Sequence, residues 1–114
     1  MKVTFDCVFY YVSDMERSIR FYQDILGFRL ISRDVVARFD VDGVLIELVP
    51  APDESALRGA GNARLCLRAD DVEQALKALR AKGARTGQEQ RKSAGVLGTV
   101  DDPDGNEICL WQYL

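Results

Sequence analysis

Apolar residues recur at helical spacing in two stretches of this chain. In residues 12–28 they are Met15, Ile19, Tyr22 and Leu26, and in residues 69–84 they are Val72, Leu76 and Leu79. A spacing of three or four residues places side chains on one face of an α-helix. The pattern therefore predicts two amphipathic helices, each with one face available for packing.

Each predicted helix has start and stop signals. Ser13 with Glu16, and Asp70 with Glu73, have the spacing of a capping box, in which each side chain bonds a backbone N–H of the first turn. Gly27 and Gly83 follow the last apolar residues, where a left-handed residue commonly ends a helix. We interpret the acidic residues at these starts, Asp14 included, as caps and not as catalytic carboxylates.

Short stretches with strand-like patterns surround both helices. Residues 4–12 are rich in β-branched and aromatic side chains, and in residues 63–69 Leu65 and Leu67 alternate with polar neighbours. Asp42-Gly43 and Asp104-Gly105 are strong turn signals. We expect further strands near residues 29–32, 36–41, 44–49, 85–90, 96–100 and 107–113.

The two halves repeat each other. Asp70 aligns with Ser13 (70 − 13 = 57), and Asp104-Gly105 aligns with Asp42-Gly43 (104 − 42 = 62). The sequence thus predicts an α+β fold of two tandem βαβββ modules, about residues 1–50 and 63–114, joined by a linker over about residues 51–62. Each small sheet leaves one face uncovered, and two such faces can enclose a cleft.

Composition narrows the possible functions. The chain has 114 residues, enough for one compact domain, and a formal net charge of −3, which argues against a nucleic-acid-binding protein. The apolar start is too short to span a membrane and lacks a signal-peptide pattern. Three widely spaced cysteines do not form a disulfide framework, so we expect a cytoplasmic protein. Histidine is absent, which removes the commonest general base and transition-metal ligand.

Motifs at both ends of the chain resemble the vicinal oxygen chelate superfamily, which includes glyoxalases, bleomycin-resistance proteins and extradiol dioxygenases. The segment YYVSDMERSIRFYQDILGF resembles the family's opening strand and helix, and DDPDGNEICLWQ resembles its D-P-D-G-N-x-I-x-L close. This resemblance implies a cup-shaped mixed sheet, frequently in a homodimer. In metal-dependent relatives, four inward-facing positions hold a divalent metal through His and Glu, whereas bleomycin-resistance relatives sequester a drug without metal.

The resemblance places the four ligand positions at Cys7, Glu47, Arg64 and Cys109. Only Glu47 keeps the family's usual residue type. A guanidinium has no lone pair to donate and stays charged, so Arg64 cannot be a ligand and would repel a divalent cation. We therefore expect no metal and no other cofactor, and predict that Arg64 pairs with Glu47 inside the cup.

Other interpretations of the cysteines remain open. Cys7, Cys109 and Glu47 could form a thiolate-rich zinc site, the cysteines could be small buried apolar residues, or Arg64 could lower the pKa of a reactive thiol.

Alternation adds further candidates for ligand binding. One strand face carries Phe5, Phe9 and Tyr11 besides Cys7, and another carries Glu107, Trp111 and Tyr113 besides Cys109. Such aromatics could stack on a flat ligand, or fill a core or a dimer interface. Arg38 and Arg68 would line the rim of the cup, or be ordinary solvated surface residues.

The sequence thus favours a metal-independent homodimer that binds a small organic ligand, such as an antibiotic, and acts by sequestration. The alternative is a divergent glyoxalase-like lyase or dioxygenase with a non-standard or lost metal site. A third class is an accessory module that binds another protein.

Overall fold

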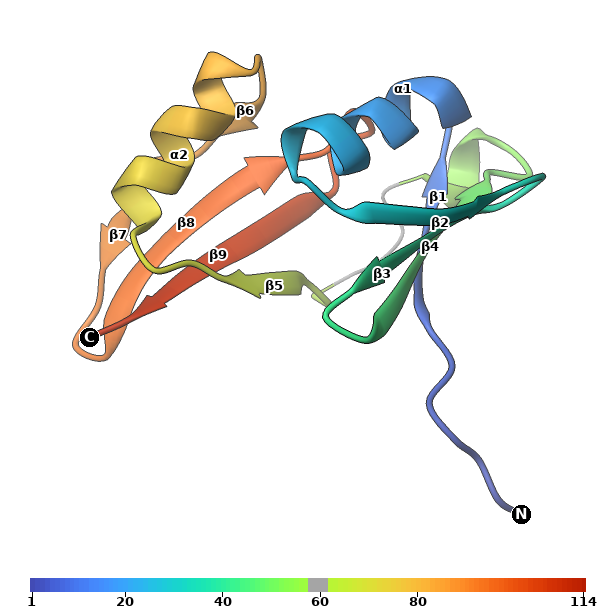
Figure 1. Ribbon diagram of the computed structural model, residues 1–114, viewed down its shortest axis with the longest axis horizontal. Coiled ribbons are helices and arrows are strands. Elements are labelled where there is room, and N and C mark those ends of the chain that lie inside the picture. Colours follow the sequence, from blue (N-terminus) through green and yellow to red (C-terminus); the bar gives the residue numbers. More distant parts are fainter. Residues whose placement is uncertain (58–61) are drawn as a thin grey trace. The chain divides into compact units, whose positions relative to one another are not determined.

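The computed structural model describes residues 1–57 and 62–114, which fall into two compact units, Met1–Leu57 and Arg58–Leu114 (Figure 1). Each unit combines one sheet with helical segments, as the α+β prediction requires. Among the described residues, no helix is long and apolar enough to cross a membrane.

Unit 1 is a mixed four-stranded sheet in the order β1-β4-β3-β2. β1 pairs parallel with β4, and the other pairs are antiparallel. Asp42 and Gly43 both have positive φ angles, so they form the two-residue turn that the sequence predicts between β3 and β4. The strands are β1 Val8–Val12, β2 Arg29–Arg33, β3 Ala37–Val41 and β4 Val44–Pro50.

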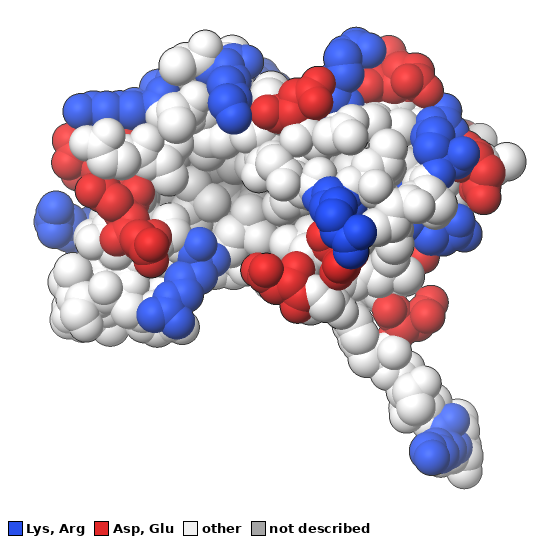
Figure 2. All heavy atoms as spheres, in the orientation of Figure 1, with Lys and Arg blue, Asp and Glu red and all other residues white. Residues whose placement is uncertain are grey.

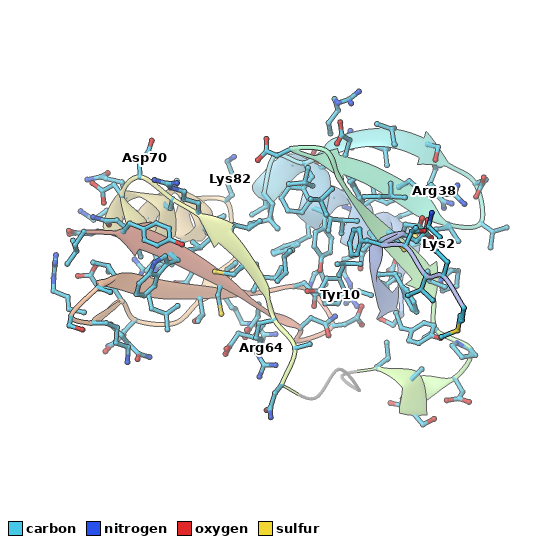
Figure 3. The ribbon with its side chains drawn as sticks, turned by 90° about the horizontal axis from the view of Figure 1, so that it is seen from below. Lys2, Tyr10, Arg38, Arg64, Asp70 and Lys82 are labelled. Carbon is cyan, nitrogen blue, oxygen red and sulfur yellow. The ribbon has the colours of Figure 1, made fainter. Side chains whose placement is uncertain are left out.

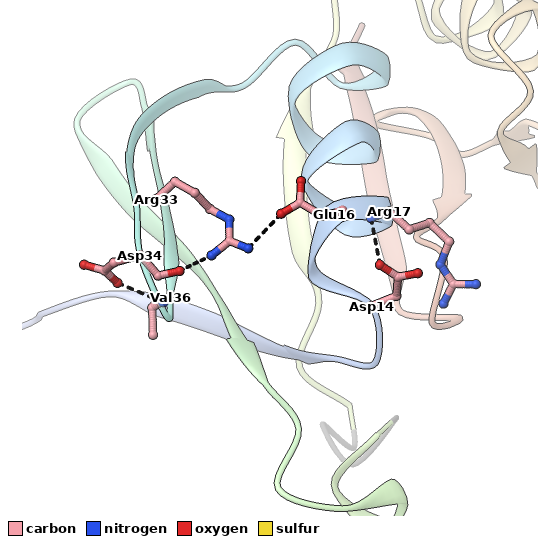
Figure 4. A network of polar contacts seen from close by, with 6 residues as sticks. All are labelled: Asp14, Glu16, Arg17, Arg33, Asp34 and Val36. Carbon is pink, nitrogen blue, oxygen red and sulfur yellow. Dashed lines mark hydrogen bonds and ion pairs between the residues drawn. The ribbon is translucent and has the colours of Figure 1, made fainter.

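The first helix begins one residue later than predicted and changes form along its length. The α-helical part, α1, is Met15–Arg20, and a π-helical turn, η1, continues it over Phe21–Ile25. The cap is Asp14, whose Oδ1 accepts from the backbone N–H of Arg17 at 3.1 Å, and not Ser13 (Figure 4). Glu16 instead pairs with Arg33 of β2 at 2.7 Å, which ties the helix to the sheet edge.

One face of this sheet packs under the helical segment. Phe39 and Tyr22 are both fully buried, and their rings lie 6.1 Å apart with Phe28 beside them. Because side chains alternate along a strand, the residues between these buried positions face away from the helical segment.

Unit 2 repeats this arrangement. Its main sheet order is β5-β9-β8-β6, and β7 also pairs with β8. Asp102 stabilises the β8–β9 turn. Its buried carboxylate accepts hydrogen bonds from the backbone N–H groups of Asp104 and Asn106. The strands are β5 Leu65–Arg68, β6 Arg85–Thr86, β7 Gln90–Arg91, β8 Gly95–Asp101 and β9 Glu107–Tyr113.

The second helix, α2 (Val72–Ala81), covers one face of the unit 2 sheet (Figure 1). Its cap is Asp71, which accepts from the N–H of Gln74 at 3.0 Å, so the predicted Asp70 box is again one residue early. The close approach of α2 to the sheet requires a glycine at position 98 of β8, because a Cβ there would lie 2.7 Å from a methyl group of Val72.

The parallel strand pairs of the two units, β1–β4 and β5–β9, are equivalent under the predicted sequence repeat. Phe9 is paired with Glu47 in unit 1, and Cys66 is paired with Cys109 in unit 2. The residue numbers differ by 57 for the first strand (66 − 9) and by 62 for the last strand (109 − 47), which are the two offsets of the sequence repeat.

Three predicted segments differ from the structure. The strand expected over residues 4–12 begins only at Val8, and the strand expected over 85–90 is replaced by the short β6 and β7. The predicted linker, 51–62, includes residues 58–61, which lie outside the described residues. Its first part contains a single 3-10 turn, η2 (Glu54–Ala56), capped by Asp53.

Candidate functional site

In each unit, the sheet face opposite the helical segment is called here the open face. In unit 1 this face carries most of the predicted ligand-binding residues. Phe9 of β1, Glu47 of β4, Arg38 of β3 and Ser32 of β2 are successive cross-strand partners, so they form one row across four strands. Tyr11 is beside this row, with its ring 5.3 Å from that of Phe9 in an edge-on arrangement. Phe9 is 48% exposed, so an aromatic surface is available there.

Arg38, which is labelled in Figure 3, forms ion pairs with two acidic residues of unit 1. Its Nε is 3.5 Å from Glu47 Oε2, and its Nη1 is 3.5 Å from Asp34 Oδ2. The guanidinium and the backbone N–H of Val36 together lower the pKa of Asp34, with the backbone bond as the larger cause. Arg38 therefore has two acidic neighbours on this face, and its role at the rim of a binding site stays a prediction.

Phe5 and Cys7 precede the first strand, although the sequence prediction placed them in it. Phe5 is 71% exposed, whereas Cys7 is half-buried. Burial, followed by the charges of Glu47 and Asp6, raises the pKa of the Cys7 thiol. A raised pKa disfavours the thiolate form of Cys7.

The open face of unit 2 carries an aromatic and cationic surface. The guanidinium carbon of Arg68 lies 5.0 Å from the centre of the Tyr113 ring, and the Trp111 ring is 6.0 Å from Tyr113 at a right angle. Trp111 covers Gly95, where a Cβ would lie 2.5 Å from the indole. A small residue on β8 thus leaves room for a large flat side chain from β9.

Arg64 and Cys109 occupy the same face. Arg64 Nε is 3.5 Å from Glu107 Oε1, and both side chains are exposed. Burial is the main cause that raises the pKa of the Cys109 thiol; Cys66 and Glu107 add to it, and Arg64 opposes it. Arg64 thus lowers the pKa of this thiol, but burial has the larger and opposite effect, and a reactive thiol on this face stays a prediction.

The four metal-ligand positions are divided between the units, with Cys7 and Glu47 in one and Arg64 and Cys109 in the other. Their chemistry does not fit the family's divalent metal, because Arg64 has no lone pair and Glu47 already has a cationic neighbour in Arg38. In the part of the chain that the structure describes, no group of three His, Cys, Asp or Glu residues is arranged to hold a metal ion. The Arg64–Glu47 pair would join two units and stays a prediction; within its own unit each residue has another partner.

Two contacts in the structure were not predicted from the sequence. Cys66 is the cross-strand partner of Cys109, and its place opposite Cys109 depends on a parallel register that no turn fixes. The Arg38–Glu47 pair had a signal, since a two-residue turn pairing Val41 with Val44 places residues 38 and 47 opposite each other.

Outside the open faces, the surface has fewer features that suggest a binding site. An open groove of about 320 Å³ lies on the helix side of unit 2 and is lined by Glu73, Leu76, Lys77 and Arg80 of α2 and by Gln88 and Glu89. Basic and acidic side chains are interspersed on the face in view in Figure 2, without a continuous basic patch.

Known proteins resemble this chain over nearly its whole length. The lactoylglutathione lyase of Haemophilus influenzae is 30% identical, in an alignment that covers 85% of this chain and 83% of that protein. A probable chloroplastic lactoylglutathione lyase of Arabidopsis thaliana is 26% identical, but the chain spans only 34% of its length. The antibiotic-binding protein TnmS3 of a Streptomyces species is 27% identical, with a TM-score of 0.77 over 99% of this chain and 100% of that one.

A family model also matches residues 4–110, which include both terminal motifs and every open-face residue described above except Trp111 and Tyr113. The βαβββ repeat, the equivalent strand pairs of the two units and the family match all indicate the same family. The chain belongs to the Glyoxalase/Bleomycin resistance protein/Dioxygenase superfamily.

Proposed function

We propose that this protein binds a small organic molecule without a metal, as an antibiotic-binding protein of the bleomycin-resistance type. The observation that carries the proposal is the surface formed by Arg68, Trp111 and Tyr113 on the open face of unit 2. TnmS3, an antibiotic-binding protein, is similar over the full length of both chains, which supports the same assignment.

Binding by this surface needs only contacts that the residues themselves supply. An indole and a phenol offer flat apolar area, and a planar ligand ring stacked on them would gain dispersion and hydrophobic burial. The Arg68 guanidinium lies over the Tyr113 ring, which leaves its N–H groups available for a ligand oxygen at the edge of the aromatic surface. Sequestration requires no bond to be broken, so the lack of a histidine base is no obstacle.

The proposal includes no metal or other cofactor. Arg64 at a ligand position and the absence of histidine both disfavour a divalent cation. We further propose that the protein is a cytoplasmic homodimer, since the open faces are apolar in part and the three cysteines form no disulfide.

A thermal-shift screen tests this function. We expect a glycopeptide, quinone or related natural-product antibiotic to raise Tm by roughly 10 °C at about 100 times its Kd, because the ligand binds only the folded state. Zinc, nickel, manganese and iron salts should leave Tm unchanged. Stoichiometric metal in protein purified without chelator or nickel resin would contradict the proposal.

A divergent lyase is the second candidate, favoured by the 30% identity with the Haemophilus influenzae lactoylglutathione lyase. One assay distinguishes the lyase from the binding protein. A lyase would form lactoylglutathione from methylglyoxal and glutathione once a divalent metal is supplied, whereas the binding protein would not.

A further inference from the structure

Cys66 on β5 and Cys109 on β9 lie directly opposite each other across two paired parallel strands of unit 2. Their side chains share the open face, because the alternate residues on both strands, such as Leu65 and its partner Ile108, face the helix side. Neither cysteine is in a disulfide. The register therefore creates a pair of thiols that the sequence separates by more than forty residues.

The strand geometry suits a covalent link. Neighbouring strands are about 4.7–4.9 Å apart, which falls within the roughly 4.4–6.8 Å between Cα atoms that disulfides span. The Cβ atoms of a disulfide are closer, about 3.5–4.5 Å, so a small approach of the strands is needed. A bridge under such strain is more easily reduced than a structural disulfide.

The two thiols differ in exposure and influence each other's charge. Burial raises the pKa of the Cys109 thiol, and the facing Cys66 adds to this effect. Cys66 is exposed, whereas Cys109 is half-buried. An oxidant from solvent thus reaches Cys66 first, and Cys109 is the neighbouring thiol on the paired strand.

We propose that Cys66 and Cys109 are a reversible dithiol–disulfide pair that responds to hydroperoxides. The Cys66 sulfur attacks one peroxide oxygen; an S–O bond forms, the O–O bond breaks, and the leaving oxygen departs as water after protonation. The Cys109 sulfur then attacks Cys66; the S–S bond forms, the S–O bond breaks, and the second water leaves. Two thiols and one hydrogen peroxide give one disulfide and two waters, with two electrons passing to the peroxide.

The bridge would be placed centrally on the open face of unit 2. It would lie between Glu107, the partner of Arg64, and the paired residues Arg68 and Trp111. This inference goes beyond the proposed function and does not depend on it, because a disulfide forms whether or not the face binds a ligand.

Peptide mapping tests the proposal directly. The intact reduced chain is treated with hydrogen peroxide at low protein concentration, remaining thiols are blocked with maleimide at low pH, and the protein is digested with trypsin without reduction. Cleavage after Arg64, Arg68 and Lys92 separates the two cysteines into peptides 65–68 and 93–114. We expect these peptides to appear joined, with a mass lower by two hydrogen atoms, and to separate on adding dithiothreitol.

Variants make the assignment specific. Cys7→Ser should form the joined peptides as the wild type does, whereas Cys66→Ser should lose them completely. Joined peptides that contain Cys7, disulfides only between chains, or oxidation of Cys66 to sulfinic acid with Cys109 left as a thiol would each overturn the proposal.

Discussion

Phe39→Ala is expected to lower the free energy of unfolding by about 3–5 kcal/mol, measured by chemical denaturation. Phe39 is fully buried on the helix side of the unit 1 sheet, between the rings of Tyr22 and Phe28. Removing the ring leaves a cavity that these neighbours fill only in part. The lost burial and the lost contacts therefore add together.

Phe9→Ala is the matched control, because it removes the same side chain from the opposite face of the same sheet. Phe9 is 48% exposed, so its removal should cost less than about 1 kcal/mol. Equal losses from the two substitutions would mean that the two faces of the sheet are assigned wrongly.

Trp111→Ala is expected to weaken binding of the antibiotic found by thermal shift by about 30-fold to 1000-fold, which corresponds to about 2–4 kcal/mol. Trp111 is the largest flat side chain on the open face of unit 2, and its position over Gly95 fixes the ring without a competing side chain. A ligand that stacks there loses most of its apolar contact when the indole is removed. Isothermal titration calorimetry gives the ratio of dissociation constants.

Two further variants separate stacking from general damage. Trp111→Phe keeps an aromatic face and should retain part of the affinity. Val35→Ala changes an exposed residue of the β2–β3 turn and should leave the affinity as it is in the wild type. An unchanged dissociation constant for Trp111→Ala would show that the ligand binds elsewhere.

The sequence predicted the module order because its strongest signals are local. Asp42-Gly43 specifies a two-residue turn, and this turn alone sets the β3–β4 register that brings Arg38 to Glu47. Alternation along β9 correctly placed Cys109, Trp111 and Tyr113 on one face. The β3–β4 register and the shared face of these β9 residues both depend only on backbone geometry over a few consecutive residues.

Features that depend on distant segments were harder to predict. The position of Cys66 opposite Cys109 comes from a parallel register, which packing of the crossover helix sets and no turn specifies. The helix caps were each placed one residue early, because Ser13 and Asp14, like Asp70 and Asp71, are adjacent residues that can both accept from the first turn. Local spacing alone cannot choose between two such neighbours.

The central claim, metal-independent binding on the open face, is tested most directly by the fluorescence of Trp111, the only tryptophan in the chain. Protein treated with EDTA is titrated with the antibiotic identified by thermal shift, and the titration is repeated with zinc and nickel added. The account predicts a saturable change in Trp111 emission with the same dissociation constant in all three conditions. A change that appears only with added metal, accompanied by formation of lactoylglutathione from methylglyoxal and glutathione, would contradict it.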